Sequence, residues 1–105
     1  MTGHMSSSAL HSMMIRNFKT RALKRLYNDG DRSGIAPDHV ARVERILAHL
    51  DIATKPKDMD IPGWRLHPLK GNYRGFWSVD ISGNWRIIFR FEDGDPRDVR
   101  YLDTH

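Results

Sequence analysis

The chain has 105 residues, of which 17 are Lys or Arg and 13 are Asp or Glu, giving a formal net charge of +4 at pH 7. This length suits one domain with one hydrophobic core, and the basic excess favours a polyanionic partner. The sequence has no cysteine, which excludes disulfides and thiolate nucleophiles, and no apolar run long enough to cross a membrane, so we expect a soluble cytoplasmic protein.

Residues 1–13 are expected to form a disordered leader or cloning extension outside the fold. They contain Gly3-His4-Met5, which resembles a cloning scar, and three consecutive serines. They lack the basic start and apolar centre of a secretory signal. We therefore expect the domain to span residues 14–105 and to begin with an edge strand at 14–18.

Two helices are predicted next. The first spans residues 19–29 and ends at Gly30, a common residue at helix ends. The second begins near Pro37, which is favourable in a first helical turn. Both predicted core faces follow helical periodicity. They comprise Ala22, Leu23, Leu26 and Tyr27 in the first helix, and Val40, Val43, Ile46, Leu47 and Leu50 in the second.

The remaining chain is predicted to form strands at 64–66, 75–82, 85–92 and 98–103, with a turn at 93–96. Gly83-Asn84 predicts a two-residue hairpin turn in which Ser82 faces Trp85 and Ile81 faces Arg86. Helices first and strands afterwards indicate an α+β fold, in which an N-terminal strand and two helices pack on an antiparallel sheet. The hairpin register predicts one face with Trp77, Val79, Ile81, Arg86, Ile88 and Arg90, and another with Phe76, Trp85, Ile87, Phe89 and Phe91.

Basic and aromatic residues alternate between positions 64 and 90. Single-stranded nucleic acid is bound by positive charge for phosphate and by aromatic rings for bases. The pattern therefore favours RNA binding, although solvated strand edges would give a similar composition. The segment contains five basic residues and one acid, Arg65, Lys70, Arg74, Arg86, Arg90 and Asp80, with Trp64, Tyr73, Trp77 and Trp85 between them.

Four residues are candidates for chemistry. Arg86 lies within a predicted strand, where a charge needs an anion or an open face. It suits a phosphate, and an ion pair with Asp80 or Asp103 is the alternative. His67 and Lys70 lie where a strand ends in a turn, and His105 is the last residue. The histidine spacing matches no metal-binding motif, so we predict neither a metal site nor a cofactor.

Several segments resemble HigB toxins of the RelE/ParE superfamily. These segments are 14–19, 65–71, 75–79, 84–87 and the closing Asp103-Thr104-His105, and their order and spacing fit along 14–105. The resemblance implies a RelE-like fold and a type II toxin–antitoxin module. The implied partner is a HigA-like antitoxin with a helix-turn-helix, and operator DNA would be bound only through the toxin–antitoxin complex.

The resemblance also implies an activity, the metal-independent cleavage of mRNA on the ribosome. The ribose 2′-hydroxyl attacks the adjacent phosphate, which requires a base, an acid and cations for the phosphorane. Histidine exchanges protons near neutral pH, whereas lysine ordinarily stays charged, but the sequence leaves the base and acid assignments open. The implied catalytic residues are His67, Lys70, Arg86 and His105, and the candidate RNA-binding residues are Arg74, Arg90 and Asp103.

Two other functions stay open, a gyrase-binding toxin because a fold alone does not fix function, and an inactive toxin because of one departure from the family. Close relatives often end Asp-Tyr-His, where this chain has Thr104. Tyr101 cannot replace the missing ring because residues 101 and 104 lie on opposite faces of a strand. The alternatives are a non-catalytic, ParE-like gyrase-binding toxin and an inactive toxin retained as an antitoxin- and operator-binding partner. The presence of His67, Lys70 and Arg86 favours the ribonuclease.

Overall fold

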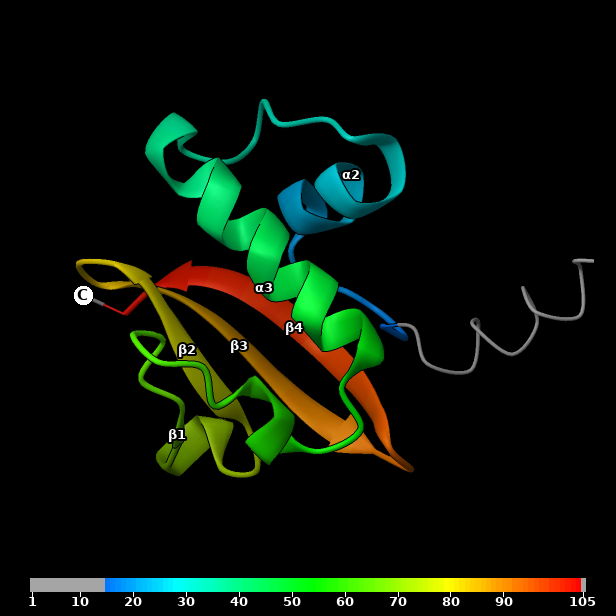
Figure 1. Cartoon of the computed structure of the whole chain (residues 1–105), viewed down its shortest axis with the longest axis vertical. Coiled ribbons are helices and arrows are strands. Elements are labelled where there is room, and N and C mark those ends of the chain that lie inside the picture. Colours follow the sequence, from blue (N-terminus) through cyan, green and yellow to red (C-terminus); the bar gives the residue numbers. More distant parts are fainter. Residues whose placement is uncertain (1–14, 105) are drawn as a thin grey trace, which may run out of the picture.

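The computed structural model describes residues 15–104, so the predicted leader, Met14 and His105 lie outside the described part. The fold of this described part is α+β, as predicted, and Figure 1 shows its two α-helices packed against a sheet with the strand order β1-β2-β3-β4. All neighbouring strands in this sheet are antiparallel. The elements, with η for 3₁₀ turns, are α2 (Arg21–Asp29), η1 (Pro37–His39), α3 (Val40–Ile52), η2 (Pro56–Met59), β1 (His67–Pro68), η3 (Gly71–Tyr73), β2 (Trp77–Ser82), β3 (Trp85–Glu92) and β4 (Asp95–Asp103).

The helices follow the sequence pattern closely. α2 ends at Gly30, whose N–H donates to the carbonyl of Leu26 at 3.0 Å. Leu23 and Leu26 of α2 are buried, and Ala22 and Tyr27 pack partly against the same core. All five predicted core residues of α3 are buried as well. The predicted core faces of both helices are therefore confirmed.

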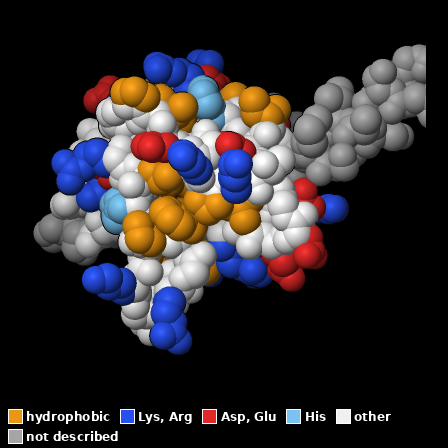
Figure 2. Space-filling view, turned by 60° about the horizontal axis from the view of Figure 1, so that its bottom comes forward, with side chains coloured by type: hydrophobic (Ala, Val, Ile, Leu, Met, Phe, Trp, Pro, Cys, Tyr) orange, Lys and Arg blue, Asp and Glu red, His pale blue; other side chains and the backbone are white. Residues whose placement is uncertain are grey.

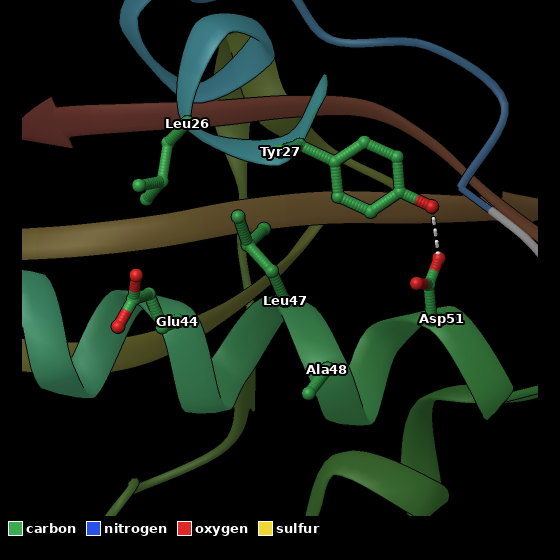
Figure 3. Close-up of a pocket in the computed structure, with 6 residues that line it drawn as sticks. All are labelled: Leu26, Tyr27, Glu44, Leu47, Ala48 and Asp51. Carbon is green, nitrogen blue, oxygen red and sulfur yellow. Dashed lines mark hydrogen bonds between the residues drawn. The ribbon is translucent and has the colours of Figure 1, made fainter. Parts of the chain in front are cut away.

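The carboxylate of Asp51 joins the two helices to the N-terminal segment. Figure 3 shows Tyr27 of α2 donating its hydroxyl hydrogen to Asp51 of α3, beside a groove of about 260 Å³. The backbone N–H of Ile15 donates to the same carboxylate oxygen at 3.2 Å. Burial, together with the bond to Asp51, raises the pKa of Tyr27 above its ordinary value. The phenol therefore stays protonated and continues to donate throughout the neutral range.

The hairpin register differs from the prediction by a bulge. The closing pair Ser82–Trp85 is confirmed, but Arg86 lies opposite Asp80, and the register shifts between Asp80 and Ser82. The predicted pair of Ile81 with Arg86 is therefore wrong, because Ile81 is the extra residue. A one-residue offset exchanges the two faces of a strand. The core face accordingly contains Trp77, Val79 and Ile81 together with Trp85, Ile87, Phe89 and Phe91.

Two predicted strands are replaced by irregular backbone. Residues 14–18 were expected to form an edge strand, but the described part of this segment makes only a single parallel bridge, from Phe18 to Val99 of β4. Residues 64–66 were also expected to form a strand. Arg65 has a φ of 52°, which an extended strand does not allow, and the carbonyl of Trp64 instead accepts the N–H of Asp80 at 2.8 Å. Pairing with β2 begins only at His67.

The last hairpin turn is shorter than predicted. Glu92 pairs with Asp95, which leaves only Asp93 and Gly94 in the turn. Both have positive φ values, 55° and 82°, as a two-residue type I′ turn requires. β4 therefore begins at Asp95 rather than at residue 98.

The loop between the helices approaches α2 closely at Gly34. A Cβ atom added there would lie 2.7 Å from the Cβ of Ala22. Overpacking of this kind costs about 1–3 kcal/mol, so we expect Gly34→Ala to lower the free energy of unfolding by that amount. Ala22→Gly removes the opposing atom, so Gly34→Ala should cost much less in that background. Urea unfolding of the four proteins tests this coupling, and an equal cost in both backgrounds would contradict it.

Candidate functional site

The face of the sheet away from the core brings distant residues of the sequence together. Directly opposed residues project to the same side of a sheet. His67 lies opposite Ser78, Ser78 opposite Ile88, and Ile88 opposite Arg100, so these four residues form one row across all the strands. The neighbouring row contains Asp80, Arg86 and Leu102. Two of the predicted catalytic residues, His67 and Arg86, therefore share this outer face.

A hollow of about 430 Å³ opens on this face. Its aliphatic lining comes from the loop before η3 and from β3 and β4, and two predicted site residues, Lys70 and Asp103, are part of it. The loop is closed by a hydrogen bond from the N–H of Leu69 to the carbonyl of Phe76 at 2.9 Å. The full lining is Leu69, Lys70, Tyr73, Ile88, Leu102, Asp103 and Thr104.

Arg86 is held in place by a carboxylate on the neighbouring strand. Its Nη1 lies 3.0 Å from Asp80 Oδ1, so the ion pair considered as an alternative is present. Its Nη1 donates a hydrogen bond to the carbonyl of Gly83 at 3.1 Å. The other oxygen of Asp80 lies 3.3 Å from Nε of Arg65. One carboxylate thus orients two guanidinium groups, and the cluster keeps a net positive charge that suits an anion.

The contacts of His67 define which ring nitrogen is available. Its Nδ1 lies 2.8 Å from the carbonyl oxygen of Arg65, and the side chain is exposed. A carbonyl oxygen only accepts hydrogen bonds, so Nδ1 must carry the hydrogen in this contact. In the neutral ring, Nε2 is then the nitrogen that accepts a proton. The geometry therefore gives His67 the form that a general base needs.

The end of β4 is tied to the β2–β3 turn. Both the N–H and the hydroxyl of Thr104 donate to the carbonyl of Asn84, each at 2.9 Å. Asp103 lies opposite Trp85 in the ladder. The residue before His105 is thus fixed beside the hollow, although the predicted catalytic His105 itself lies outside the described residues.

The remaining predicted RNA-binding residues lie away from the hollow's lining. Arg74 is exposed in the loop after η3 and forms no ion pair with any residue between 15 and 104. Arg90 lies further along the outer face, where its Nε is 2.6 Å from Asp98 and its Nη2 is 3.3 Å from Glu92. Two carboxylates therefore offset the charge of Arg90.

Most aromatic rings expected to alternate with the charges belong to the core instead. Trp64 is 2% exposed, and Trp77 and Trp85 pack against the core cluster. The interpretation of these three as RNA-stacking residues is wrong, because their side chains lie in or against the core between the sheet and the helices. Tyr101 also packs against the core, where its hydroxyl is 2.8 Å from Nδ1 of His39. Of the four predicted rings, only Tyr73 lines the hollow.

Asp98 fastens the N-terminal segment to the sheet and predicts a dependence of stability on pH. Its carboxylate accepts from Asn17 Nδ2 at 2.8 Å, and its N–H donates to Asn17 Oδ1 at 2.9 Å. The bond from Asn17, and then that from Arg90, hold the pKa of Asp98 below its ordinary value. The carboxylate therefore stabilises the fold above the unfolded-state pKa of ~3.9, and this contribution is lost as the pH falls through the lower folded-state pKa.

We expect Asp98→Asn to be less stable than the parent protein at pH 7, and this difference to shrink as the pH falls through the folded-state pKa of Asp98. Asn also tolerates the positive φ of 52° at this position, so the backbone is unaffected. Urea unfolding of both proteins between pH 7 and pH 2 measures the difference. A difference that stays constant with pH would contradict the assigned charge effect.

The outer surface combines apolar side chains with positive charge. Figure 2 shows a patch of hydrophobic side chains with Lys and Arg around much of it, and with Asp and Glu both among the basic groups above the patch and to its right. Within residues 15–104, no helix is long and apolar enough to cross a membrane. No group of three or more His, Asp or Glu side chains in this range is arranged to hold a metal ion.

Comparisons with known proteins identify the family. The family model for the RelE-like toxin of the type II toxin–antitoxin system HigB matches residues 16–105. "Endoribonuclease HigB" of Proteus vulgaris is 39% identical over 92 residues, which cover 88% of this chain and 100% of that protein. "Toxin HigB-1" of Vibrio cholerae is 34% identical over 94 residues, which cover 88% of this chain and 98% of that protein. The resemblance predicted from the sequence motifs is confirmed, and the chain belongs to the HigB family of RelE-like toxins of type II toxin–antitoxin systems.

Proposed function

We propose that this toxin is an endoribonuclease that cuts mRNA on the ribosome and so inhibits translation. The observation that carries the proposal is the outer face of the sheet, where His67 and the oriented Arg86 lie on one surface with the hollow lined by Lys70. The name and full-length similarity of the Proteus vulgaris endoribonuclease support the same activity.

In the proposed reaction, the ribose 2′-oxygen attacks the adjacent phosphorus and displaces the 5′-oxygen of the next nucleotide. A 2′,3′-cyclic phosphate and a free 5′-hydroxyl result. His67 takes the proton of the 2′-hydroxyl through Nε2, while Arg86 stabilises the negative charge that grows on the phosphorane. Lys70 adds a second positive charge, and His105 or Lys70 returns a proton to the leaving oxygen. These steps use only side chains of this chain, without a metal ion or a cofactor.

Further residues are proposed to hold the RNA. Asp103 supplies carboxylate oxygens at the hollow, where they can accept hydrogen bonds from a base amino group. Arg74 is exposed and suits a phosphate contact. Arg90 is retained as a weaker candidate because Asp98 and Glu92 already offset its charge.

Membership of a type II toxin family implies an antitoxin partner. We propose that this partner is a HigA-like protein with a helix-turn-helix, and that the toxin reaches operator DNA only within that complex. Because the substrate is mRNA on the ribosome, the proposed place of action is the cytoplasm.

A reconstituted translation reaction tests the proposed function. A defined mRNA is incubated with the folded toxin, with and without ribosomes, and cuts are mapped by primer extension. We expect cuts within the reading frame only when ribosomes are present. Intact mRNA accompanied by gyrase-dependent DNA breaks would replace the proposal with the gyrase-binding alternative. If the toxin is harmless to cells that lack its antitoxin, the result would instead support the alternative of an inactive toxin.

A further inference from the structure

The lining of the hollow is chemically suited to a flat, partly apolar ligand. Two partly exposed aliphatic side chains, Leu69 and Leu102, contribute apolar surface above the buried Ile88, and Tyr73 is the one aromatic ring among the described lining residues. The volume of about 430 Å³ lies within the range of roughly 300–1,000 Å³ for sites that hold small molecules. Lys70 places a positive charge in the same lining. An apolar surface with a ring and a cation suits a nucleobase and its phosphate.

The ring of Tyr73 is held by two neighbours rather than left free. The guanidinium carbon of Arg100 lies 5.7 Å from the ring centroid, within the distance of a cation–π contact. The ring of Phe76 packs against Tyr73 at a centroid distance of 5.5 Å and an interplanar angle of 74°. A ring already fixed in position loses little conformational entropy when a ligand stacks on it.

Arg100 differs from the other arginines of the outer face. Arg86, Arg90 and Arg97 each pair with a carboxylate. Arg100 forms no ion pair with any residue in the described range. Its Nε, like that of Arg97, is buried without a hydrogen-bond partner. Burying an unpaired polar group is unfavourable, so the guanidinium of Arg100 is a candidate to bind an external anion. It lies opposite Ile88, which lines the hollow.

We infer that Tyr73 and Arg100 form a nucleobase-binding element, in which Tyr73 stacks on a base of single-stranded mRNA and Arg100 acts as a positioning residue for the ring. The inference rests on the proposed function and deepens it, because it assigns base preference at the cutting site to this pair. Stacking tolerates every base, but the walls of the hollow limit the size and the edge of the base that fits. The pair therefore affects which codons are cut more than it affects the chemical step.

Two substitutions of Tyr73 test the nucleobase-binding element, one that removes the aromatic ring and one that keeps it. Cleavage rates are measured over a set of codons on ribosome-bound mRNA for the parent protein and for Tyr73→Leu and Tyr73→Phe. We expect Tyr73→Leu to raise KM on the preferred codons by on the order of 10-fold and to flatten the ranking of codons. Tyr73→Phe keeps the ring and should retain the ranking. Thermal unfolding establishes that each variant is folded.

Arg100 is tested against a matched arginine on the same strand. Arg100→Gln should flatten the codon ranking, and Arg100→Lys, which keeps a cation over the ring, should restore part of it. Arg97→Gln removes the same charge from the same face, but Arg97 is paired with Glu92 at 3.1 Å. The codon ranking of the Arg97→Gln protein should therefore match that of the parent protein.

The outcomes separate this inference from the proposed function. If the parent protein cuts mRNA and folded Tyr73→Leu keeps the same KM and ranking, the nucleobase-binding element is wrong while the ribonuclease stands. If Arg97→Gln alters the ranking as much as Arg100→Gln does, the role of Arg100 is wrong. If the parent protein cuts no mRNA, the proposed function fails and the inference fails with it.

Discussion

Arg86→Ala is expected to reduce the cleavage of ribosome-bound mRNA by roughly 10²- to 10³-fold, the usual cost of removing one group that stabilises transition-state charge. The side chain of Arg86 is 20% exposed, and its guanidinium is fixed by Asp80 and by the carbonyl of Gly83. Fixed donors stabilise charge without having to reorganise during the reaction. Asp80 keeps Arg65 as a partner in the variant, so the loss of activity should occur without unfolding.

Three comparisons show whether the effect of Arg86 is chemical. Lys70→Ala should also abolish most cleavage, because Lys70 lines the adjacent hollow. Arg86→Lys keeps the charge but loses the planar fork, so it should recover only part of the rate. Arg65→Ala removes the other partner of Asp80 and one positive charge of the cluster. The side chain of Arg65 is 79% exposed, so this variant should lower the rate less than Arg86→Ala does. A folded Arg86→Ala protein with the parent rate would show that Arg86 plays no part in the reaction.

Trp64→Ala is expected to lower the free energy of unfolding by about 3–5 kcal/mol, as for other large aromatic residues removed from a core. Trp64 is 2% exposed, and its ring meets that of His49 edge-on at a centroid distance of 4.9 Å. Domains of this kind are stable by about 5–15 kcal/mol in total, so much of the stability would be lost. We therefore expect lower protein levels and weaker toxicity in cells.

Urea unfolding measures this loss, with Ile52→Ala as the control. Ile52 is a large apolar residue of α3 that is 68% exposed, and its substitution should change the free energy of unfolding by less than about 0.5 kcal/mol. The carbonyl of Trp64 also accepts the N–H of Asp80, so the backbone here borders the cluster that orients Arg86. A loss below about 1 kcal/mol for Trp64→Ala would contradict its place in the core.

The sequence by itself determined the features that depend on local chemistry. Helical periodicity identified the whole core face of α3, and Gly30 marked the end of α2. Gly83-Asn84 fixed the Ser82–Trp85 closing pair, because only a few residue types suit a two-residue turn. His67, Lys70 and Arg86 were found as candidates through their resemblance to a family, since each alone is an ordinary polar residue.

Only the tertiary structure decided which side chains meet. A single extra residue, Ile81, shifts the pairing of Arg86 to Asp80 and places Trp77 on the same face as Ile87 and Phe89, and no local pattern encodes such a bulge. The contact of Tyr73 with Arg100 likewise depends on η3 lying beside β4, which are far apart in the sequence. Periodicity and turn residues indicate local conformation. Strand register and contacts between distant side chains are instead determined by packing across the whole fold.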